Sequence, residues 1–240
     1  MKFYATKKKL PITILFLVCV LTVLIIIAGL TESSGAYFGA ERKMFPVHSA
    51  LTEENYVALT FDIEYGNDKT EGILEILKEF EADATFFVTG RWAESFKDKT
   101  KKIAENFEIG THSYTHPHMT NISYGECLNE LKISKEKIEE ITKKKVTLFR
   151  APYGEYDKQV LSIAQSLNLK AIRWDVDSYD WKLIPSKDII KRVLEKTRGG
   201  SIILFHSNSD DILDFLPIIL QTLKDRGYGF KSVSDLIYKG

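Results

Sequence analysis

The sequence has few cysteines, and this absence limits how the protein can be stabilised. Only two of its 240 residues are cysteines, Cys19 and Cys127. Cys19 lies inside a long apolar run and Cys127 inside a helical pattern, so no disulfide can form within the part of the chain that follows the run. That part has to be stabilised by a hydrophobic core, which a chain of this length is able to bury.

Net charge is the second absence. The chain has 33 basic and 33 acidic residues, and the first 32 residues hold four of the basic and one of the acidic ones, so the remainder carries a formal charge of −3. This balance does not indicate a nucleic-acid surface, which takes a basic face. There is no internal repeat or low-complexity tract. A neutral or hydrophilic substrate fits this composition better than an anionic polymer.

One long apolar run stands near the start of the chain. From Pro11 to Leu30 it contains no charged residue, and it is long enough to cross a hydrocarbon core of roughly 30 Å as a helix. We predict a single transmembrane anchor at residues 10–30, with the basic residues 1–9 in the cytoplasm and the rest of the chain outside. The length of the run favours an uncleaved anchor, whereas cleavage near Ala36 would make the protein secreted.

The remaining chain is predicted to be a linker followed by an α/β domain. Residues 31–54 are small, polar and aperiodic, and we interpret them as the linker. Residues 55–240 alternate short runs rich in β-branched and aromatic residues with segments of helical periodicity. This alternation predicts parallel pairing, in a doubly wound sheet or a (β/α) barrel. We predict seven strands, which end at Phe61, Val88, His112, Arg150, Val176, His206 and Val233.

Ionisable residues stand at the ends of five of these strands. In a (β/α) barrel the carboxyl ends of the strands converge on the active site. Five separate loops that each bring an ionisable residue to one rim are hard to obtain from packing alone. We therefore predict one site that contains Asp62, His112, Arg150, Asp177 and His206.

Two of the histidines have the spacing of metal ligands. His112 and His116 can present both imidazoles to one ion where the segment turns helically. Two histidines and a carboxylate leave one position of a tetrahedral divalent ion open, and such an ion activates water for hydrolysis. Asp62 is then placed to accept the proton of that water. Arg150 is expected to pair with Asp62 and keep it ionised.

The other end of the predicted site supplies an acid. His206 is expected to donate a proton to a departing amine, and Asp177 to orient the imidazole. A purely structural interpretation exists for each residue, with Arg150 in a buried ion pair, Asp177 as a cap and His206 as a satisfied histidine at a strand end. His118 is interpreted as a loop histidine that faces solvent.

Five motifs occur in a fixed order along the chain. They are "LTFD" at 59–62, "HSYTH" at 112–116, "RAPYG" at 150–154, "WDVDSYDW" at 174–181 and "ILFH" at 203–206. In this order they resemble the motifs of the polysaccharide deacetylase family, named for the chitooligosaccharide deacetylase of nodulation, over about residues 55–237. The membrane segment and the "FDIEYG" form look most like the sporulation-associated members of spore-forming Gram-positive bacteria.

The resemblance implies a distorted (β/α) barrel and metal-dependent hydrolysis of N-acetyl groups on a glycan. Zinc is the expected ion, with cobalt or another divalent ion as alternatives. By this analogy Asp62 is the base, Arg150 tunes it, and His112 and His116 hold the metal. His206 is the acid, supported by Asp177. The predicted substrate contacts are the Tyr153 backbone N–H at the oxyanion, Leu204 in the acetate pocket and Trp181 stacked on a sugar face.

One position departs from the family pattern. The family usually reads T-F-D-D-G, with the second aspartate as the third metal ligand, and this chain has Ile63 there. Three alternatives follow: Glu64 reaches the ion, two histidines and waters hold it, or no catalytic metal binds. Asp68 is a further candidate ligand that reads better as the cap of the next helix.

Three functions are compatible with these features. The leading hypothesis is a membrane-anchored enzyme that removes N-acetyl groups from sugars of peptidoglycan or a related cell-wall glycan, linked to sporulation. The alternative is a glycan-binding protein of the same fold that has weak or no catalysis, because Ile63 replaces a ligand. The third is hydrolysis of another C–N bond, as in the cyclic-amide hydrolases that share the fold. The sequence does not predict an oligomeric state.

Overall fold

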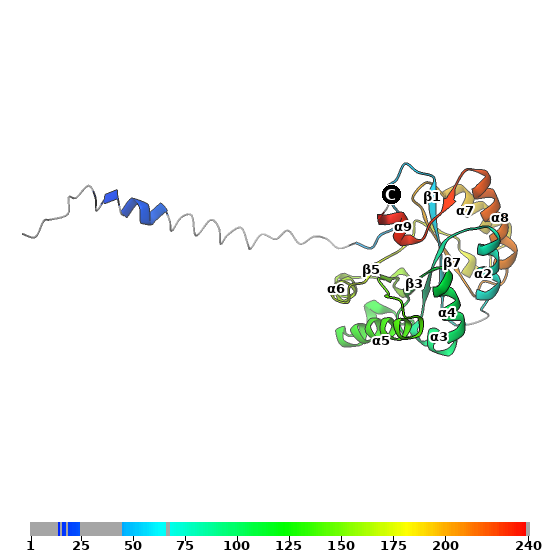
Figure 1. The fold of residues 1–240 in the computed structure, drawn as a ribbon, viewed down its shortest axis with the longest axis horizontal. Helices are drawn as coiled ribbons and strands as arrows, with labels where there is room; N and C mark the ends of the chain where they lie inside the picture. The colour runs from blue at the N-terminus through cyan, green and yellow to red at the C-terminus, as the bar shows by residue number, and fades with distance from the viewer. Residues whose placement is uncertain (1–13, 15, 18, 25–44, 66–67, 239–240) are drawn as a thin grey trace, which may run out of the picture. The chain divides into compact units, whose positions relative to one another are not determined.

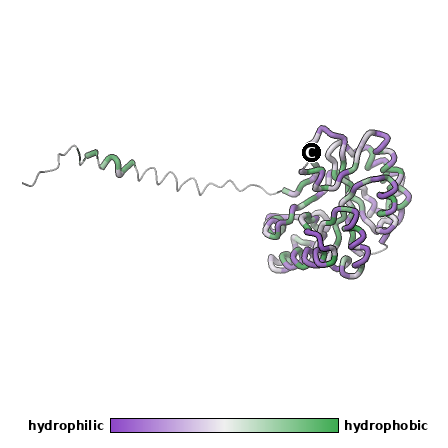
Figure 2. The backbone as a smooth tube through the Cα atoms, in the orientation of Figure 1, coloured by the Kyte–Doolittle hydropathy of each residue, from purple (hydrophilic) through white to green (hydrophobic). Residues whose placement is uncertain are grey.

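The computed structural model describes residues 45–65 and 68–238, with a few N-terminal positions (14, 16–17 and 19–24). The chain divides into two compact units, Met1–Lys43 and Met44–Gly240. The described positions of the first unit are helical, exposed and mostly hydrophobic (Figure 2). Among the described residues, no helix is both long enough and apolar enough to span a membrane. The basic segment 1–9, most of the anchor predicted at 10–30, the position of Ala36 and the linker up to residue 44 lie outside the described residues.

The second unit is built on a curled sheet of parallel strands, a distorted (β/α) half-barrel (Figure 1). Seven strands stand in the order β5-β4-β3-β2-β1-β7-β6, and β8 pairs with the start of β1. The predicted class, a distorted barrel of about seven parallel strands, is confirmed for this unit. The strands are β1 (Tyr56–Ile63), β2 (Ala84–Val88), β3 (Glu108–Thr111), β4 (Leu148–Phe149), β5 (Lys170–Ala171), β6 (Val176–Asp177), β7 (Ile202–His206) and β8 (Gly229–Phe230).

β1 is a central strand, and its burial explains this position. Seven of its eight residues are buried, as in parallel strands that are covered on both faces. Side chains of a strand alternate between the two faces. Phe61 and Ile63 belong to the main hydrophobic core, and Ala58 belongs to the smaller inner core. Asp62 shares the face of Ala58, so it points into the barrel, whereas Ile63 points out.

The single strand predicted over residues 170–176 is wrong, because the chain crosses from one edge of the sheet to the other there. β5 pairs with β4 and β6 pairs with β7, at opposite ends of the strand order. Between them, the Arg173 N–H donates to the Val47 carbonyl at 2.7 Å. Asp175 accepts a hydrogen bond from the Ile202 N–H at 2.8 Å. These side-chain and loop contacts replace ladder bonds.

Part of the predicted linker belongs to the folded unit. Val47 forms a parallel bridge with Ile172, and Ser49 an antiparallel bridge with Ser201. Gly200 has φ +83°, and a Cβ there would lie 2.1 Å from the Ala50 carbonyl oxygen, so only glycine fits this close approach. The segment 45–50 thus covers the gap between the two edges of the sheet, and the folded unit begins before the predicted boundary at residue 55.

The helices connect the strands and flank the sheet. α5 begins with the predicted capping box, in which Ser123 and Glu126 satisfy each other's backbone N–H. Cys127 is buried in this helix, as predicted for a small packed side chain. The helices are α2 (Thr70–Glu79), α3 (Gly90–Ser95), α4 (Lys97–Asn106), α5 (Tyr124–Thr142), α6 (Lys158–Ser166), α7 (Ser186–Lys196), α8 (Ile212–Asp225) and α9 (Val233–Tyr238).

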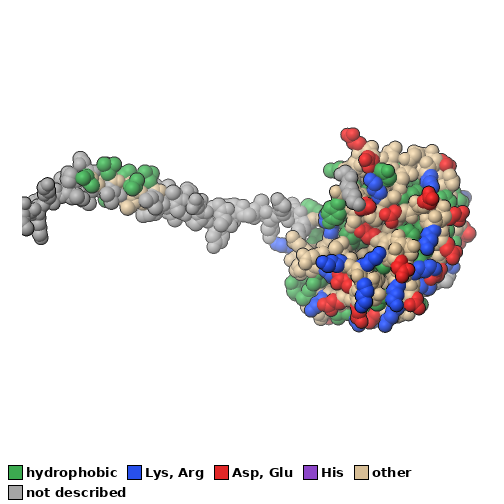
Figure 3. Space-filling model, viewed as in Figure 1, with side chains coloured by type: hydrophobic (Ala, Val, Ile, Leu, Met, Phe, Trp, Pro, Cys, Tyr) green, Lys and Arg blue, Asp and Glu red, His purple; other side chains and the backbone are tan. Residues whose placement is uncertain are grey.

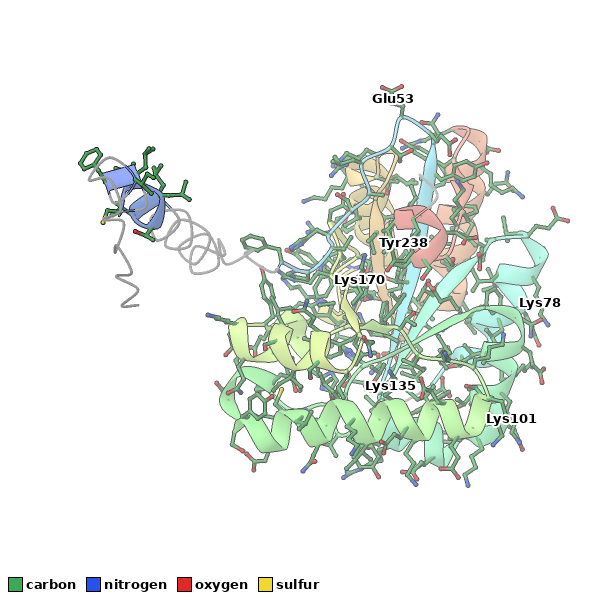
Figure 4. All side chains as sticks on the ribbon, turned by 60° about the vertical axis from the view of Figure 1, so that its left-hand side comes forward. Glu53, Lys78, Lys101, Lys135, Lys170 and Tyr238 are labelled. Carbon is green, nitrogen blue, oxygen red and sulfur yellow. The ribbon has the colours of Figure 1, made fainter. Side chains whose placement is uncertain are left out.

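α9 covers the inner core at the amino ends of the strands. Val233 and Leu236 are buried with Ala58 and Ile202 in that core. At the edge of the sheet, the Lys170 ammonium lies 4.3 Å from the centroid of the Tyr238 ring (Figure 4). On the face shown in Figure 3, basic and acidic side chains are interspersed. The carboxyl ends of the strands are therefore the end that remains available for a site.

Candidate active site

A cleft of about 470 Å³ opens at the carboxyl ends of the strands. The structure brings the five predicted rim residues together there: four line the cleft, and Arg150 is buried directly behind Asp62. Glu64 and His116, the other predicted metal ligands, also line it. The full lining is Asp62, Glu64, His112, His116, Tyr153, Trp174, Asp177, Asp180, Trp181, Leu183, Leu204, His206, Asn208, Ser209 and Asp210.

Asp62 is held by a buried ion pair. Arg150 Nη1 donates to Asp62 Oδ1 at 2.8 Å and to Thr60 Oγ1 at 2.9 Å, while Nη2 donates to the Arg173 carbonyl at 3.0 Å. Burial raises the pKa of Asp62, but the charges of Arg150, His112 and His206 outweigh it and hold the pKa below its usual value. Asp62 is therefore a carboxylate with one oxygen fixed and the other free to accept a proton.

His112 is fixed in one tautomer. Its Nδ1 lies 2.8 Å from the Arg150 carbonyl, so Nδ1–H is the donor and Nε2 keeps its lone pair. Nε2 lies 3.6 Å from Asp62 Oδ2. Burial lowers the pKa of His112 to about 4, so the ring is neutral at physiological pH. A neutral imidazole that donates its other N–H to a carbonyl is the arrangement of a metal ligand.

His116 and Glu64 form the second part of the histidine group. The rings of His112 and His116 have centroids 4.9 Å apart, and His116 Nε2 lies 3.1 Å from Glu64 Oε2. Burial raises the pKa of Glu64 and lowers that of His116, so both shift toward the uncharged form. The loop that carries His116 is fixed by Glu130 of α5, which accepts hydrogen bonds from the Tyr114 and Thr115 N–H groups at 2.8 Å.

Ile63 points away from His116 and Glu64, because β1 extends through residue 63. Adjacent strand residues face opposite sides, and the Ile63 side chain is fully buried in the main core. Glu64, two residues after Asp62, returns to the cleft side. The N-cap position of α2 is Lys69 and not the predicted Asp68. Asp68 precedes it, and its Oδ1 accepts from the Thr70 N–H at 2.8 Å while its Oδ2 pairs with Lys99 at 2.7 Å.

The donor types at this place fit a divalent cation. Neutral imidazole nitrogens and a carboxylate are the ligands of hydrolytic zinc sites, and the free Nε2 lone pair of His112 faces the cleft residue Asp62. As the side chains lie, however, Glu64 is engaged with His116. In the described part of the chain, no group of three or more His, Cys, Asp or Glu side chains is placed to hold an ion.

The carboxylate that holds His206 is Asp180, and the prediction of Asp177 for this contact is wrong. Asp180 Oδ1 lies 2.8 Å from His206 Nδ1, and its Oδ2 accepts from the His206 N–H at 2.8 Å. Burial lowers the pKa of His206, but the hydrogen bond and charge of Asp180, with Asp62 and Asp177, raise it overall. Asp177 instead accepts from the Tyr179 N–H at 3.0 Å. Tyr179 has φ +62°, and this turn brings Asp180 to His206.

Apolar and aromatic side chains complete the cleft. Leu204 is 2% exposed on its floor, whereas Tyr153 and Trp181 are each 55% exposed at its mouth. Trp174 lines it too, a residue that sequence reasoning placed in a motif without a role. His118 lies in a loop and is exposed to solvent, as predicted, but its ring also stacks on Tyr153 with centroids 4.0 Å apart.

The chain belongs to the polysaccharide deacetylase family, whose family model matches residues 50–172, and the resemblance carried by the five motifs is confirmed. It is 32% identical over 193 residues to the Bacillus subtilis peptidoglycan-N-acetylmuramic acid deacetylase PdaA, covering 78% of this chain and 73% of PdaA. It is 32% identical to B. subtilis YlxY, over 80% of this chain and 60% of that protein.

Solved structures give the same fold. The crystal structure of wild-type BA3943 from Bacillus anthracis, described as a CE4 family pseudoenzyme, matches with a TM-score of 0.77 and 34% identity, over 80% of this chain and 68% of that one. A BA3943 mutant described as having restored enzymatic activity matches with a TM-score of 0.77 and 35% identity, over 80% and 71% of the two chains. This chain is thus similar to active deacetylases and to a pseudoenzyme.

Proposed function

We propose that this protein hydrolyses the N-acetyl group of an N-acetylated sugar in peptidoglycan or a related cell-wall glycan. The observation that carries the proposal is the pairing of Asp62 with His206, which are register partners at the ends of β1 and β7. Each is held by a buried residue of opposite charge, Asp62 by Arg150 and His206 by Asp180. A base and an acid are thereby fixed on one side of one cleft.

This pair has the states that amide hydrolysis requires. Asp62, kept ionised by Arg150, takes a proton from a water molecule as the oxygen of that water bonds to the acetyl carbon. His206, whose pKa is raised by Asp180, gives its proton to the nitrogen as the C–N bond breaks. The products are acetate and the free amine of the sugar.

The histidine group supports a metal-assisted reaction. His112, His116 and Glu64 would hold the ion, with zinc first and cobalt or another divalent ion as alternatives. When bound, such an ion acidifies water and polarises the carbonyl. His112 would contribute a neutral imidazole nitrogen, because the Arg150 carbonyl fixes its tautomer. Glu64 would supply the carboxylate that the family usually has at the position of Ile63.

The lining supports a neutral sugar as substrate. Within the described residues, the ionisable groups that line the cleft are carboxylates and imidazoles, with no lysine or arginine. The exposed rings of Tyr153 and Trp181 are suited to sugar faces. The relative PdaA is named for a peptidoglycan substrate. An anchor at residues 10–30 with the domain outside the cytoplasm, and a link to sporulation, remain parts of this proposal.

A second candidate is a glycan-binding protein of the same fold with little or no turnover. The burial of Ile63 in the core favours it, because the position of a usual metal ligand is committed to packing. The likeness to BA3943 also favours it. This candidate keeps the cleft as a binding site and makes the acid and base vestigial.

Acetate release separates the two candidates. The full chain, purified without chelator and supplied with Zn²⁺, is incubated with N-acetylglucosamine oligomers and with peptidoglycan, next to His206→Ala. Acetate from the wild type and none from the variant supports the hydrolase. Binding of the oligomer without acetate release, at equal affinity in both proteins, supports the binding protein. If neither binding nor acetate release is observed, the glycan is rejected as the ligand.

A further inference from the structure

Two loops that follow neighbouring strands are joined by aromatic and ionic contacts at the mouth of the cleft. The His118 and Tyr153 rings are nearly parallel, 13° apart with centroids at 4.0 Å. The Tyr153 ring also contacts the His116 ring, with centroids 4.7 Å apart and an angle of 68° between the ring planes. Tyr153 is therefore in contact with two imidazoles of the loop after β3, although it belongs to the loop after β4.

His118 is itself held in place. Its Nδ1 lies 3.0 Å from Glu155 Oε2, and Glu155 follows Tyr153 by two residues. The His118 carbonyl accepts a hydrogen bond from the Asn121 N–H at 2.9 Å. The side chain of the next residue, Met119, is fully buried. His118 therefore contacts the Tyr153 loop at both the ring and the ring nitrogen, from a backbone that cannot easily move away.

The Tyr153 backbone needs such support. Tyr153 has φ +59°, a left-handed conformation that is unfavourable for a residue with a Cβ. Gly154 follows with φ +67°, and a Cβ there would lie 2.7 Å from the Trp174 ring. A non-glycine residue stays in such a conformation where its surroundings fix it. The His118 and His116 rings supply such contacts to the Tyr153 side chain.

We propose that His118 is a positioning residue that acts through Tyr153. Its stacked ring fixes the Tyr153 ring at the edge of the cleft, and the fixed ring sets how tightly an N-acetylated sugar binds. The choice of a sugar ligand rests on the proposed function, whereas the stacking itself does not. His118 touches neither the reacting groups nor the floor of the cleft, and half of its side chain is exposed to solvent.

The test compares His118→Ala with His118→Phe, which keeps a flat ring but loses the bond to Glu155. Affinity for the N-acetylglucosamine tetramer is measured by calorimetry on the full chain, in a His206→Ala background so that bound tetramer is not turned over. His118→Ala should weaken binding roughly 3- to 10-fold, the range expected for one aromatic pair. His118→Phe should bind within about twofold of the background. His48→Ala, in the segment 45–50, which does not line the cleft, is the matched histidine control.

Two affinity results overturn the proposal. One is an unchanged affinity in His118→Ala. The other is an equal loss in His118→Ala and His118→Phe, which would make the Glu155 contact or the fold, and not the stacked ring, the cause. Thermal unfolding of both variants is recorded with each titration, so that a loss of folded protein is not read as a loss of affinity.

Proton NMR keeps the test independent of the ligand. Stacking on Tyr153 should shift the His118 ring protons upfield, and Tyr153→Leu should abolish that shift. If the background protein does not bind the tetramer, the proposed function fails as to substrate, while a shift that disappears in Tyr153→Leu still supports the stacked pair. An unshifted His118 ring in the wild type overturns the inference whatever the binding result.

Discussion

The two halves of the cleft differ in how firmly their ionisable groups are held. In the acid–base half, Asp62 is paired with a fully buried Arg150 and His206 is bonded twice to Asp180. In the histidine half, only His112 is deeply buried, and the His116 and Glu64 side chains are 13% and 30% exposed and contact each other. The acid–base half is thus rigidly partnered, and the histidine half, which lacks the family's usual aspartate at position 63, is looser. The proposed base and acid thus keep their buried partners although Ile63 stands at the family's usual ligand position.

The largest effect is expected from breaking the acid–base half at Asp62. Asp62→Asn removes the proposed base and should lower acetate release about 10²- to 10⁴-fold. It also leaves the Arg150 charge buried without a partner, which costs about 3–5 kcal/mol of unfolding free energy. Acetate release and urea unfolding measure the two effects.

The double variant Asp62→Asn with Arg150→Met is the control for this prediction. Removing the unpaired charge should recover most of the stability without recovering activity. Recovery of activity in the double variant would contradict the assignment of Asp62 as the base.

Ile63→Asp asks whether the histidine half can be rebuilt by restoring a carboxylate. The Ile63 side chain is fully buried in the main core, so a carboxylate there should lower the unfolding free energy by about 3–5 kcal/mol. Ile63→Val, which should cost about 1 kcal/mol, is the size control. A full-chain Ile63→Asp protein as stable as the wild type would mean that the end of β1 turns and delivers residue 63 to the cleft.

Asp180→Asn and Asp177→Asn separate the observed partner of His206 from the predicted one. Asp180 stabilises the protonated imidazole and raises the pKa of His206. Without Asp180 the pKa of His206 falls, so the imidazole loses its proton at lower pH. The alkaline limb of the pH–activity profile therefore moves to lower pH. Activity near pH 7 should drop about 10- to 100-fold in Asp180→Asn. Asp177→Asn should move the limb much less, and an equal movement in both would restore Asp177 to the role.

The smallest effect is expected at Glu64. Glu64→Gln keeps the shape of the side chain and removes its negative charge. If Glu64 is the third ligand, the affinity for Zn²⁺, measured by chelator competition, should fall about tenfold. His118→Ala leaves all proposed ligands in place and is the control. An unchanged affinity in Glu64→Gln would mean that the two histidines and water are sufficient.

Much of the fold follows from local patterns in the sequence. The buried run of β1, the helical spacing of α5 and its capping box were each sufficient to predict an element, because burial and capping depend on nearby residues. The strand predicted over 170–176 failed because its apolar run is interrupted by contacts of Arg173 and Asp175 with residues far along the chain. The assignment of residues 45–50 to the linker failed for a similar reason, because their sequence does not reveal that they pair with residues 172 and 201.

The site divides in the same way. Strand ends were enough to gather Asp62, His112, Arg150 and His206, because parallel strands present their carboxyl ends at one edge. The choice between Asp177 and Asp180 was beyond the sequence, since both stand within four residues and only the left-handed turn at Tyr179 decides which one faces His206. His118 had no pattern at all, because its stacking partner lies 35 positions away.

The sequence by itself determined the family, the parallel α/β fold and the residues proposed to carry protons, because these depend on motif order and on the alternation of strand and helix. Tertiary structure alone decided that Ile63 packs in the core while Glu64 returns to the cleft, that Asp180 holds His206, and that His118 stacks on Tyr153. Each of these depends on where a strand ends and how two distant loops meet. Those directions are set by packing across the whole sheet and not by neighbours along the chain.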